Sequence, residues 1–122
     1  MKTKSVRSNF TIYHNPRCSK SRATLELLQE HGVEPKIIEY LKSPPNPAAL
    51  KSILAKLKLR PEQLIRKTED LYKDLIAGKN LNDAQLIAAM VDNPILIERP
   101  IVVAGTRAAL GRPPETVLTL LK

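Results

Sequence analysis

The stretch "NFTIYHNPRCSKSRATLELLQEHGVEPKIIEYL", residues 9–41, decides the fold that this chain is expected to adopt. Its first residues alternate, so that Phe10 and Ile12 lie on one side of an extended chain and Thr11 and Tyr13 on the other. Alternation with a period of two is typical of a strand, and the Asn-Pro pair that follows ends it. The stretch therefore opens with a strand that has one apolar face.

A helix and a second strand follow within the same stretch. Ala23 and Leu27 have the i, i+4 spacing of one helix face, and Gly32 is suited to end the helix. The helix is expected to begin at or just after Cys18, the only cysteine of the chain. Residues 35–41 are rich in Ile and Tyr, which indicates a strand. Strand, helix and strand form a βαβ unit whose two strands run parallel, with Cys18 in its first turn.

The middle of the chain, residues 46–93, is expected to form several short helices. Pro44, Pro45 and Pro47 precede the first of these helices, as N-terminal prolines can, and Asp83 is a candidate N-cap for the helix that contains Leu86. Two groups of apolar residues have helical spacing there: Leu50, Ile53, Leu54 and Leu57, and then Leu86, Ile87, Met90 and Val91.

The end of the chain returns to an extended pattern. A β-branched run, Ile101–Val103, and the segment Arg107–Leu110 predict a hairpin that turns at Ala104-Gly105-Thr106. A last helix is expected to start at Pro113-Pro114. The elements together predict an α/β fold with a mixed four-stranded sheet, in the order βαβ…ββα, and a helical insertion.

Length and composition favour one domain in a reducing compartment. A chain of 122 residues suits a single domain, placed at residues 9–122 with 46–93 as the insertion and 1–8 as a loose leader. The N-terminus has no apolar segment of the kind found in secretory signals, and no apolar run approaches the ~20 residues of a membrane span. A single cysteine cannot form an internal disulfide. These features favour the cytoplasm and no membrane partner.

The formal charge of +8 makes the chain basic. It nevertheless has no Trp and only 3% aromatic residues, so few side chains are available to stack on bases. Nucleic acid is therefore not an expected partner. The charge serves either solubility or the attraction of small anions.

Cys18 stands in a positive neighbourhood, with Arg17, Lys20 and Arg22 close in sequence and His14 four residues before it. The thiolate is the nucleophilic form of cysteine, and a helix N-terminus, nearby cations or a protonated His14 would all lower the pKa of the thiol. A buried structural cysteine is the alternative, but a loop beside a proline and charged residues speaks against it.

Two known cysteine motifs do not fit the residues after Cys18. The phosphatase spacing Cys-x5-Arg would require Arg where the chain has Thr24, and the redox motif C-x-x-C would require Cys where it has Ser21. The site is thus a single thiol without a resolving partner. An external thiol must release whatever Cys18 binds covalently.

From about Phe10 to Leu121 the chain resembles the arsenate reductases of the glutaredoxin-coupled family, and most of all their short chromosomal members. The segments that carry the resemblance are "IYHNPRCSKSRATL", "LIRK", "LIAAMVDNPILIERPIVV" and "GRPPETVL". The resemblance implies a thioredoxin-like core with a helical insertion. It also implies a set of site residues: Cys18 as nucleophile, His14 as the residue that tunes it, Arg66, Arg99 and Arg112 as an oxyanion pocket, and Pro100 as a cis-proline. Arg107 is a rival for the place of Arg112.

The resemblance further implies reduction of arsenate to arsenite, with glutathione as co-substrate, glutaredoxin as partner, and no metal or bound cofactor. Two other functions remain open. One is a redox-responsive regulator that binds RNA polymerase, against which Ser21 speaks because such regulators typically carry C-x-x-C. The other is a glutathione-dependent thiol–disulfide reductase on the same scaffold.

Overall fold

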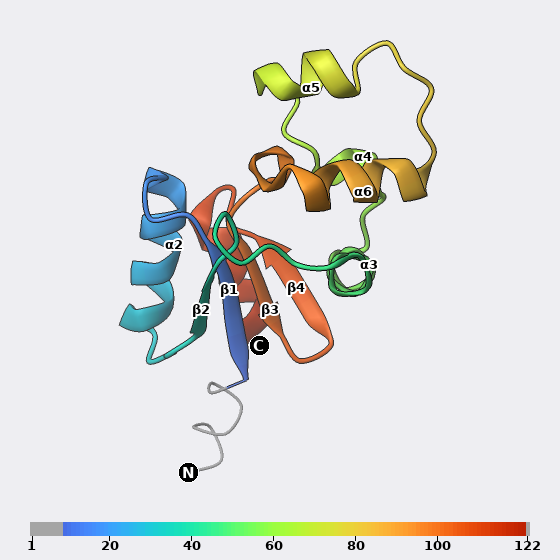
Figure 1. Cartoon of the computed structure of the whole chain (residues 1–122). Coiled ribbons are helices and arrows are strands. Elements are labelled where there is room, and N and C mark those ends of the chain that lie inside the picture. Colours follow the sequence, from blue (N-terminus) through green and yellow to red (C-terminus); the bar gives the residue numbers. More distant parts are fainter. Residues whose placement is uncertain (1–8, 122) are drawn as a thin grey trace. The chain divides into compact units, whose positions relative to one another are not determined.

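The computed structural model describes residues 9–121, which form two compact units (Figure 1). The first unit combines the N-terminal part up to Ser43 with the C-terminal part from Arg99, and the second is Pro44–Glu98. The second unit contains the segment expected to be a helical insertion, residues 46–93. The expected leader, residues 1–8, lies outside the described residues.

The first unit is built on a mixed four-stranded sheet in the order β2-β1-β3-β4. The strands are β1 (Phe10–His14), β2 (Lys36–Glu39), β3 (Ile101–Ala104) and β4 (Arg107–Leu110). β1 and β2 are parallel, whereas β3 is antiparallel to both β1 and β4. Both the parallel pair expected from residues 9–41 and the mixed four-stranded sheet are therefore confirmed.

The hairpin between β3 and β4 is tighter than the sequence suggested. Ala104 pairs with Arg107, so it belongs to the strand, and the turn consists of Gly105 and Thr106 alone. Gly105 has φ +63°, a backbone conformation that glycine adopts without steric cost and that two-residue hairpin turns require. The expected turn at Ala104-Gly105-Thr106 was therefore wrong by one residue.

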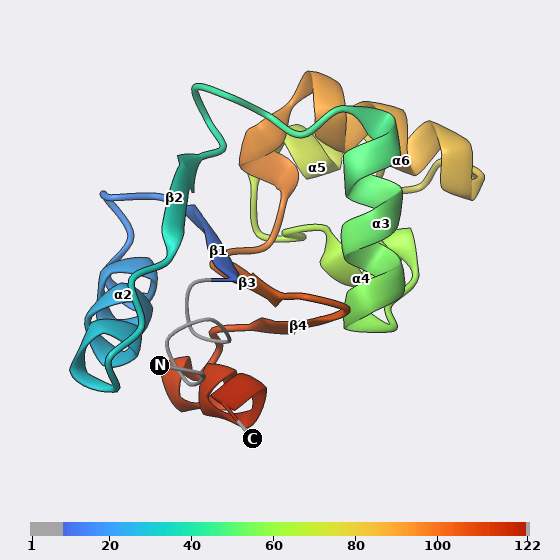
Figure 2. The ribbon, with the colours of Figure 1, turned by 90° about the horizontal axis from the view of Figure 1, so that it is seen from below.

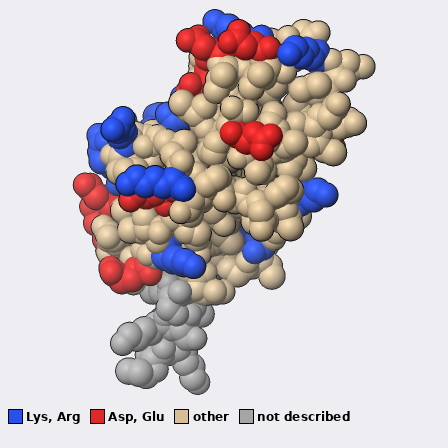
Figure 3. Space-filling view, viewed as in Figure 1, with Lys and Arg blue, Asp and Glu red and all other residues tan. Residues whose placement is uncertain are grey.

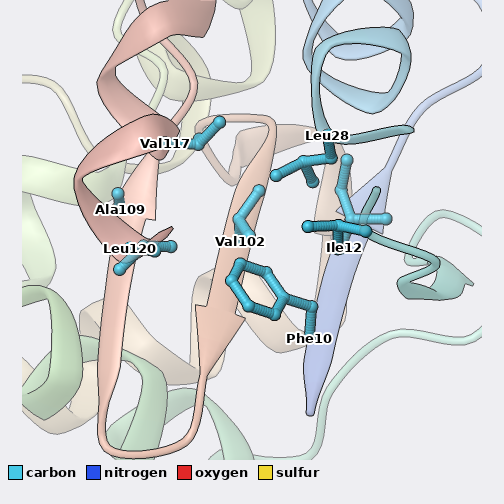
Figure 4. Close-up of a cluster of buried hydrophobic side chains, with 8 residues drawn as sticks. Phe10, Ile12, Leu28, Val102, Ala109, Val117 and Leu120 are labelled. Atoms are coloured by element: carbon cyan, nitrogen blue, oxygen red, sulfur yellow. The ribbon is translucent and has the colours of Figure 1, made fainter. Parts of the chain in front are cut away.

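The core of this unit lies between the sheet and two helices on one of its faces, α2 (Ser19–Glu30) and the 3-10 helix η2 (Pro114–Leu121) (Figure 2). Figure 4 shows side chains of both helices pointing toward those of the strands. Removing each large apolar side chain from water stabilises the fold by roughly 1.5–3 kcal/mol. The buried cluster consists of Phe10, Ile12, Leu28, Val33, Val102, Ala109, Val117 and Leu120.

The last helix is a 3-10 helix and not the α-helix expected after Pro113-Pro114. In a 3-10 helix residues three apart lie on the same side. Val117 and Leu120 are spaced in this way and both are buried, whereas Leu118 and Leu121 are half-buried. The tighter helix thus suits the apolar spacing of this segment better than an α-helix would.

The second unit is helical, as expected for residues 46–93. It contains four α-helices and the 3-10 helix η1. One isolated antiparallel β-bridge pairs Ile65 with Ile97. Among residues 9–121, no helix combines the length and apolar character needed to cross a membrane. The helices are α3 (Pro47–Leu57), α4 (Pro61–Leu64), α5 (Asp70–Leu75), α6 (Asp83–Asp92) and η1 (Pro94–Leu96).

The N-cap of α6 is Asn82. The expectation that Asp83 would be the N-cap was therefore wrong by one residue. An N-cap residue needs an extended backbone and a side-chain oxygen that accepts from the third helical residue. Asn82 has φ −83° and ψ 174°, and its side chain accepts from the Gln85 backbone at 2.8 Å. The Gln85 side chain in turn accepts from the Asn82 backbone, which completes a capping box. Asp83 is the first residue inside the helix.

Candidate active site around Cys18

Cys18 is held in a short loop that local hydrogen bonds fix on both sides. The Cys18 backbone N–H donates to the Asn15 carbonyl at 3.0 Å, and the Arg17 N–H donates to the Asn15 side chain at 3.0 Å. Further along, Arg22 Nη1 reaches back from α2 to the Pro16 carbonyl at 2.9 Å. Cys18 is the N-cap residue of α2, so the helix begins just after it, as expected.

The environment of Cys18 favours the thiolate. Burial is the largest single influence and raises the pKa of the thiol. Hydrogen bonds from the Ser21 N–H, the Arg99 guanidinium and the Lys20 N–H, together with the charge of Arg99, outweigh it, so the pKa lies below its ordinary value. The full charge that acts on the sulfur comes from Arg99, far along the chain, and not from the basic sequence neighbours.

His14 is linked to this loop through Ser21. His14 Nδ1 lies 2.6 Å from Ser21 Oγ, which also accepts from the Asn15 N–H at 3.0 Å. His14 is buried at the end of β1, and this burial, aided by Arg22 and opposed by Glu39, lowers its pKa. His14 is therefore mostly neutral at neutral pH and does not supply the full positive charge that a protonated histidine would have given.

From the sequence alone, Ser21 stands out only as the residue in place of a second cysteine. In the structure Ser21 is fully buried. Its hydroxyl oxygen contacts His14 and the Asn15 N–H, whereas its own N–H donates to the Cys18 sulfur. A small hydroxyl residue on the first turn of a helix, where it can face the preceding loop, is the signal that could have identified it.

Arg99 is the second part of the site. Its guanidinium hydrogen-bonds to Cys18, while its Nε and Nη1 are buried and have no hydrogen-bond partner within residues 9–121. Buried donors of a charged group are normally paired, so two such donors indicate a place for an anion. The Arg99–Pro100 peptide bond is cis, and a second cis bond, which the sequence did not suggest, joins Arg112 and Pro113.

Arg112 lies beside Arg99, whereas Arg107 is used elsewhere. Arg112 Nε donates to the Arg99 carbonyl at 2.9 Å. Arg107 instead donates to the Thr119 and Leu120 carbonyls at 3.2 and 2.9 Å, at the end of η2. Of the two rival arginines, Arg112 is thus the one that contacts Arg99.

Gly111, just before Arg112, packs tightly against α2 and against Pro100. Its N–H donates to the Pro100 carbonyl at 2.9 Å. A Cβ atom on Gly111 would lie 2.4 Å from Thr24 Oγ1 on α2 and 2.7 Å from Pro100 Cγ. Only a residue without a side chain fits between them.

Arg66, the remaining candidate of the oxyanion pocket, lies in the second unit. Its Nε is 3.3 Å from a Glu69 oxygen and its Nη1 is 3.0 Å from a Glu98 oxygen, and the side chain is only 15% exposed. The structure thus places the Arg99 side chain at Cys18 and Arg112 beside the Arg99 backbone, with His14 linked through Ser21. That Arg66 joins them remains a prediction.

The charges elsewhere on the molecule are mixed. On the face shown in Figure 3, lysine and arginine side chains lie among carboxylates. Within residues 9–121 no group of three or more His, Cys, Asp and Glu side chains is placed to hold a metal ion. The chemistry that the described residues offer is therefore that of one activated thiol beside buried arginine donors.

A thiol at a helix N-terminus, on a mixed four-stranded sheet and beside an arginine with two nitrogens unpartnered among the described residues, is the arrangement expected of a thiol-dependent, anion-binding class of proteins. The chain belongs to the ArsC family, whose sequence profile matches residues 13–120. It is 54% identical over 112 residues to "uncharacterized protein YfgD" of Escherichia coli K12, covering 90% of this chain and 94% of that one. It is 46% identical to an arsenate reductase of Neisseria meningitidis, covering 90% and 96%.

The fold agrees with this assignment. The solved structure of an arsenate reductase from Vibrio cholerae superposes with a TM-score of 0.88 at 48% identity, covering 91% of this chain and 96% of that one. The thioredoxin-like fold expected from the sequence is thereby confirmed.

Proposed function

We propose that this chain reduces arsenate to arsenite, with Cys18 as nucleophile and with glutathione and glutaredoxin as external reductants. The observation that carries the proposal is Arg99, which hydrogen-bonds to Cys18 while two of its buried nitrogens lack a partner among the described residues. A guanidinium presents planar donors that suit the oxygens of a tetrahedral anion. The names of the relatives support arsenate as that anion.

The anion is held by donors from several segments. Arg99 offers Nε and Nη1, and Arg112 adjoins it through the Arg99 carbonyl. The first turn of α2 adds backbone N–H groups, which favour negative charge. Arg66 is proposed as the third arginine, with a smaller contribution because Glu69 and Glu98 already offset its charge.

The first chemical step forms a bond between sulfur and arsenic. The Cys18 thiolate attacks the arsenic of arsenate, and one protonated oxygen leaves as water, so that arsenic stays in the +5 state. A depressed thiol pKa raises the thiolate fraction available for this attack. The arginines stabilise the negative charge of the oxygens throughout.

Reduction needs two further thiols, because the chain has a single cysteine and Ser21 stands where a resolving cysteine would be. Glutathione displaces a second oxygen as water and binds arsenic through sulfur. The glutaredoxin thiolate then attacks the glutathione sulfur, forming a mixed disulfide and leaving the bonding electron pair on arsenic, which becomes +3. Water releases arsenite and returns the Cys18 thiol. Because these two reductants are cytoplasmic thiols, the cytoplasm is the compartment that we propose.

A coupled assay tests the proposal. The full chain with arsenate, glutathione, glutaredoxin, glutathione reductase and NADPH should oxidise NADPH steadily, and Cys18→Ser should abolish this. Thioredoxin in place of glutathione and glutaredoxin should give no steady turnover. Reduction of a small disulfide without any reduction of arsenate would select the thiol–disulfide reductase instead. Retention by RNA polymerase without either activity would select the regulator.

A further inference from the structure

A cavity of about 230 Å³ lies beside the Cys18 loop, and of its lining only His14 and Asn15 belong to the site described so far. One wall is the loop just before Cys18, with Pro16 and Arg17. The opposite wall is the end of β2 and the turn after it, with Glu39, Leu41 and Lys42. All residues that line the cavity belong to the first unit.

Both walls are fixed by hydrogen bonds that involve their backbone. The loop wall is held by the Asn15 and Pro16 contacts described above. In the opposite wall, the Lys42 and Ser43 N–H groups both donate to the Glu39 carbonyl at 2.9 Å, which closes a turn directly after β2. The cavity is therefore formed before a ligand arrives, as small-molecule sites usually are.

The lining carries charges of both signs next to an apolar side chain. Arg17 and Lys42 present cations, and the Glu39 carboxylate lies 3.4 Å from Lys42 Nζ. The Lys42 and Glu39 side chains are 81% and 41% exposed, so their ion pair is weak and can exchange partners at little cost. Leu41 is 43% exposed, which leaves apolar surface beside the charges. Such a lining suits a zwitterionic group with methylene carbons attached.

We propose that this cavity binds the γ-glutamyl end of glutathione, an inference that rests on the proposed function and assigns the thiol co-substrate a site of its own. The α-carboxylate of the γ-glutamyl group pairs with Lys42 and Arg17, and its ammonium pairs with Glu39. Its methylene groups contact Leu41 and Pro16. Two cations and one carboxylate thus match the one carboxylate and the one ammonium of the γ-glutamyl end.

The distance from the cavity to the nucleophile suits this ligand. Pro16 lines the cavity and is two residues from Cys18, a separation of at most roughly 7 Å along an extended chain. The arm from the γ-glutamyl α-carbon to the cysteine sulfur of glutathione is also about two residues long, roughly 7 Å. A molecule anchored in the cavity can therefore bring its sulfur to an arsenic atom on Cys18.

Direct binding tests the site without any need for turnover. The full chain, labelled with ¹⁵N, is titrated with S-methylglutathione, which cannot react as a thiol. Amide signals of residues 39–42 and of Arg17 should shift in a saturable way. Lys42→Glu should weaken binding about threefold to tenfold. The control Lys36→Glu makes the same charge change at the other end of β2, outside the cavity lining, and should weaken it much less.

Steady-state kinetics separate this inference from the proposed function. In the coupled assay Lys42→Glu should raise the KM for glutathione and leave the KM for arsenate unchanged. Absence of saturable shifts at residues 39–42, or equal effects of Lys42→Glu and Lys36→Glu, would overturn the site even if arsenate is reduced. Saturable binding in a chain that does not reduce arsenate would support the site and overturn the proposed function.

Discussion

Arg99 and Arg66 are both proposed to bind the same anion, yet the two units give their guanidinium groups different hydrogen-bond partners. In the first unit Arg99 has two buried nitrogens without a partner among the described residues. In the second unit Arg66 is held by two carboxylates, at 3.3 and 3.0 Å. A guanidinium with free buried donors loses hydration without compensation, whereas one between carboxylates is stabilised by them. The difference indicates that Arg99 serves binding first and Arg66 serves the fold first.

The largest effect that this comparison predicts concerns turnover in Arg99→Lys. Lysine keeps the positive charge but loses the planar pair of donors. Loss of one preorganised donor to a charged transition state lowers kcat by about 10²–10³-fold, so we expect kcat/KM for arsenate to fall about 100-fold. The coupled NADPH assay measures it. Arg66→Lys is the matched control, and its kcat/KM for arsenate should fall about tenfold or less. Equal falls in the two variants would contradict the distinction between the two arginines.

The next effect concerns the free energy of unfolding, which should fall on loss of Arg66 but not on loss of Arg99. Arg66→Met leaves Glu69 and Glu98 without their cation, so we expect the free energy of unfolding to fall by about 2 kcal/mol. Arg99→Met removes a buried charge with unpaired donors, so the free energy of unfolding should stay level or rise by about 1 kcal/mol. Urea denaturation followed by circular dichroism measures both. A marked loss of stability in Arg99→Met would show that Arg99 also supports the fold.

A smaller effect concerns the titration of Cys18. Hydrogen bonds and the charge of Arg99 lower the pKa of the thiol, so the thiolate forms at lower pH than in free cysteine. The rate of alkylation by iodoacetamide should therefore reach its midpoint at a lower pH than for free cysteine in the same buffer. Arg99→Gln removes one of these causes and should move the midpoint up, whereas Arg66→Gln should leave it nearly unchanged. A midpoint at or above that of free cysteine would contradict the activated thiol.

The smallest effect is expected for His14→Ala. Because burial lowers the pKa of His14, the imidazole is mostly neutral and acts on Cys18 only by holding Ser21. The alkylation midpoint should rise, but less than in Arg99→Gln. His31→Ala, which changes an exposed histidine just after α2, is the control and should have no effect. A rise as large as that in Arg99→Gln would mean that His14 carries charge.

Local patterns in the sequence predicted the fold better than the site. The alternation around Phe10 and Ile12 and the glycine after the first helix depend on neighbours in the chain, so strand faces and helix ends could be inferred. The capping box of Asn82 and Gln85 is also local, so the N-cap at Asn82 could have been predicted from the sequence. The carboxylates beside Arg66 and the two partners of Ser21 could not be inferred, because they depend on which side chains folding brings together.

Gly111 sets a spacing that the chemistry depends upon. The gap it leaves between Thr24 and Pro100 is too narrow for a methyl group, since even a Cβ atom would lie 2.4 Å from the threonine oxygen. Thr24 belongs to the helix that starts after Cys18, and Pro100 follows Arg99 directly. Gly111 therefore acts as a spacer of minimal thickness between α2, which starts after Cys18, and the proline that follows Arg99. A side chain there is expected to push α2 away from Pro100, and with it Cys18 away from the anion that we propose Arg99 binds.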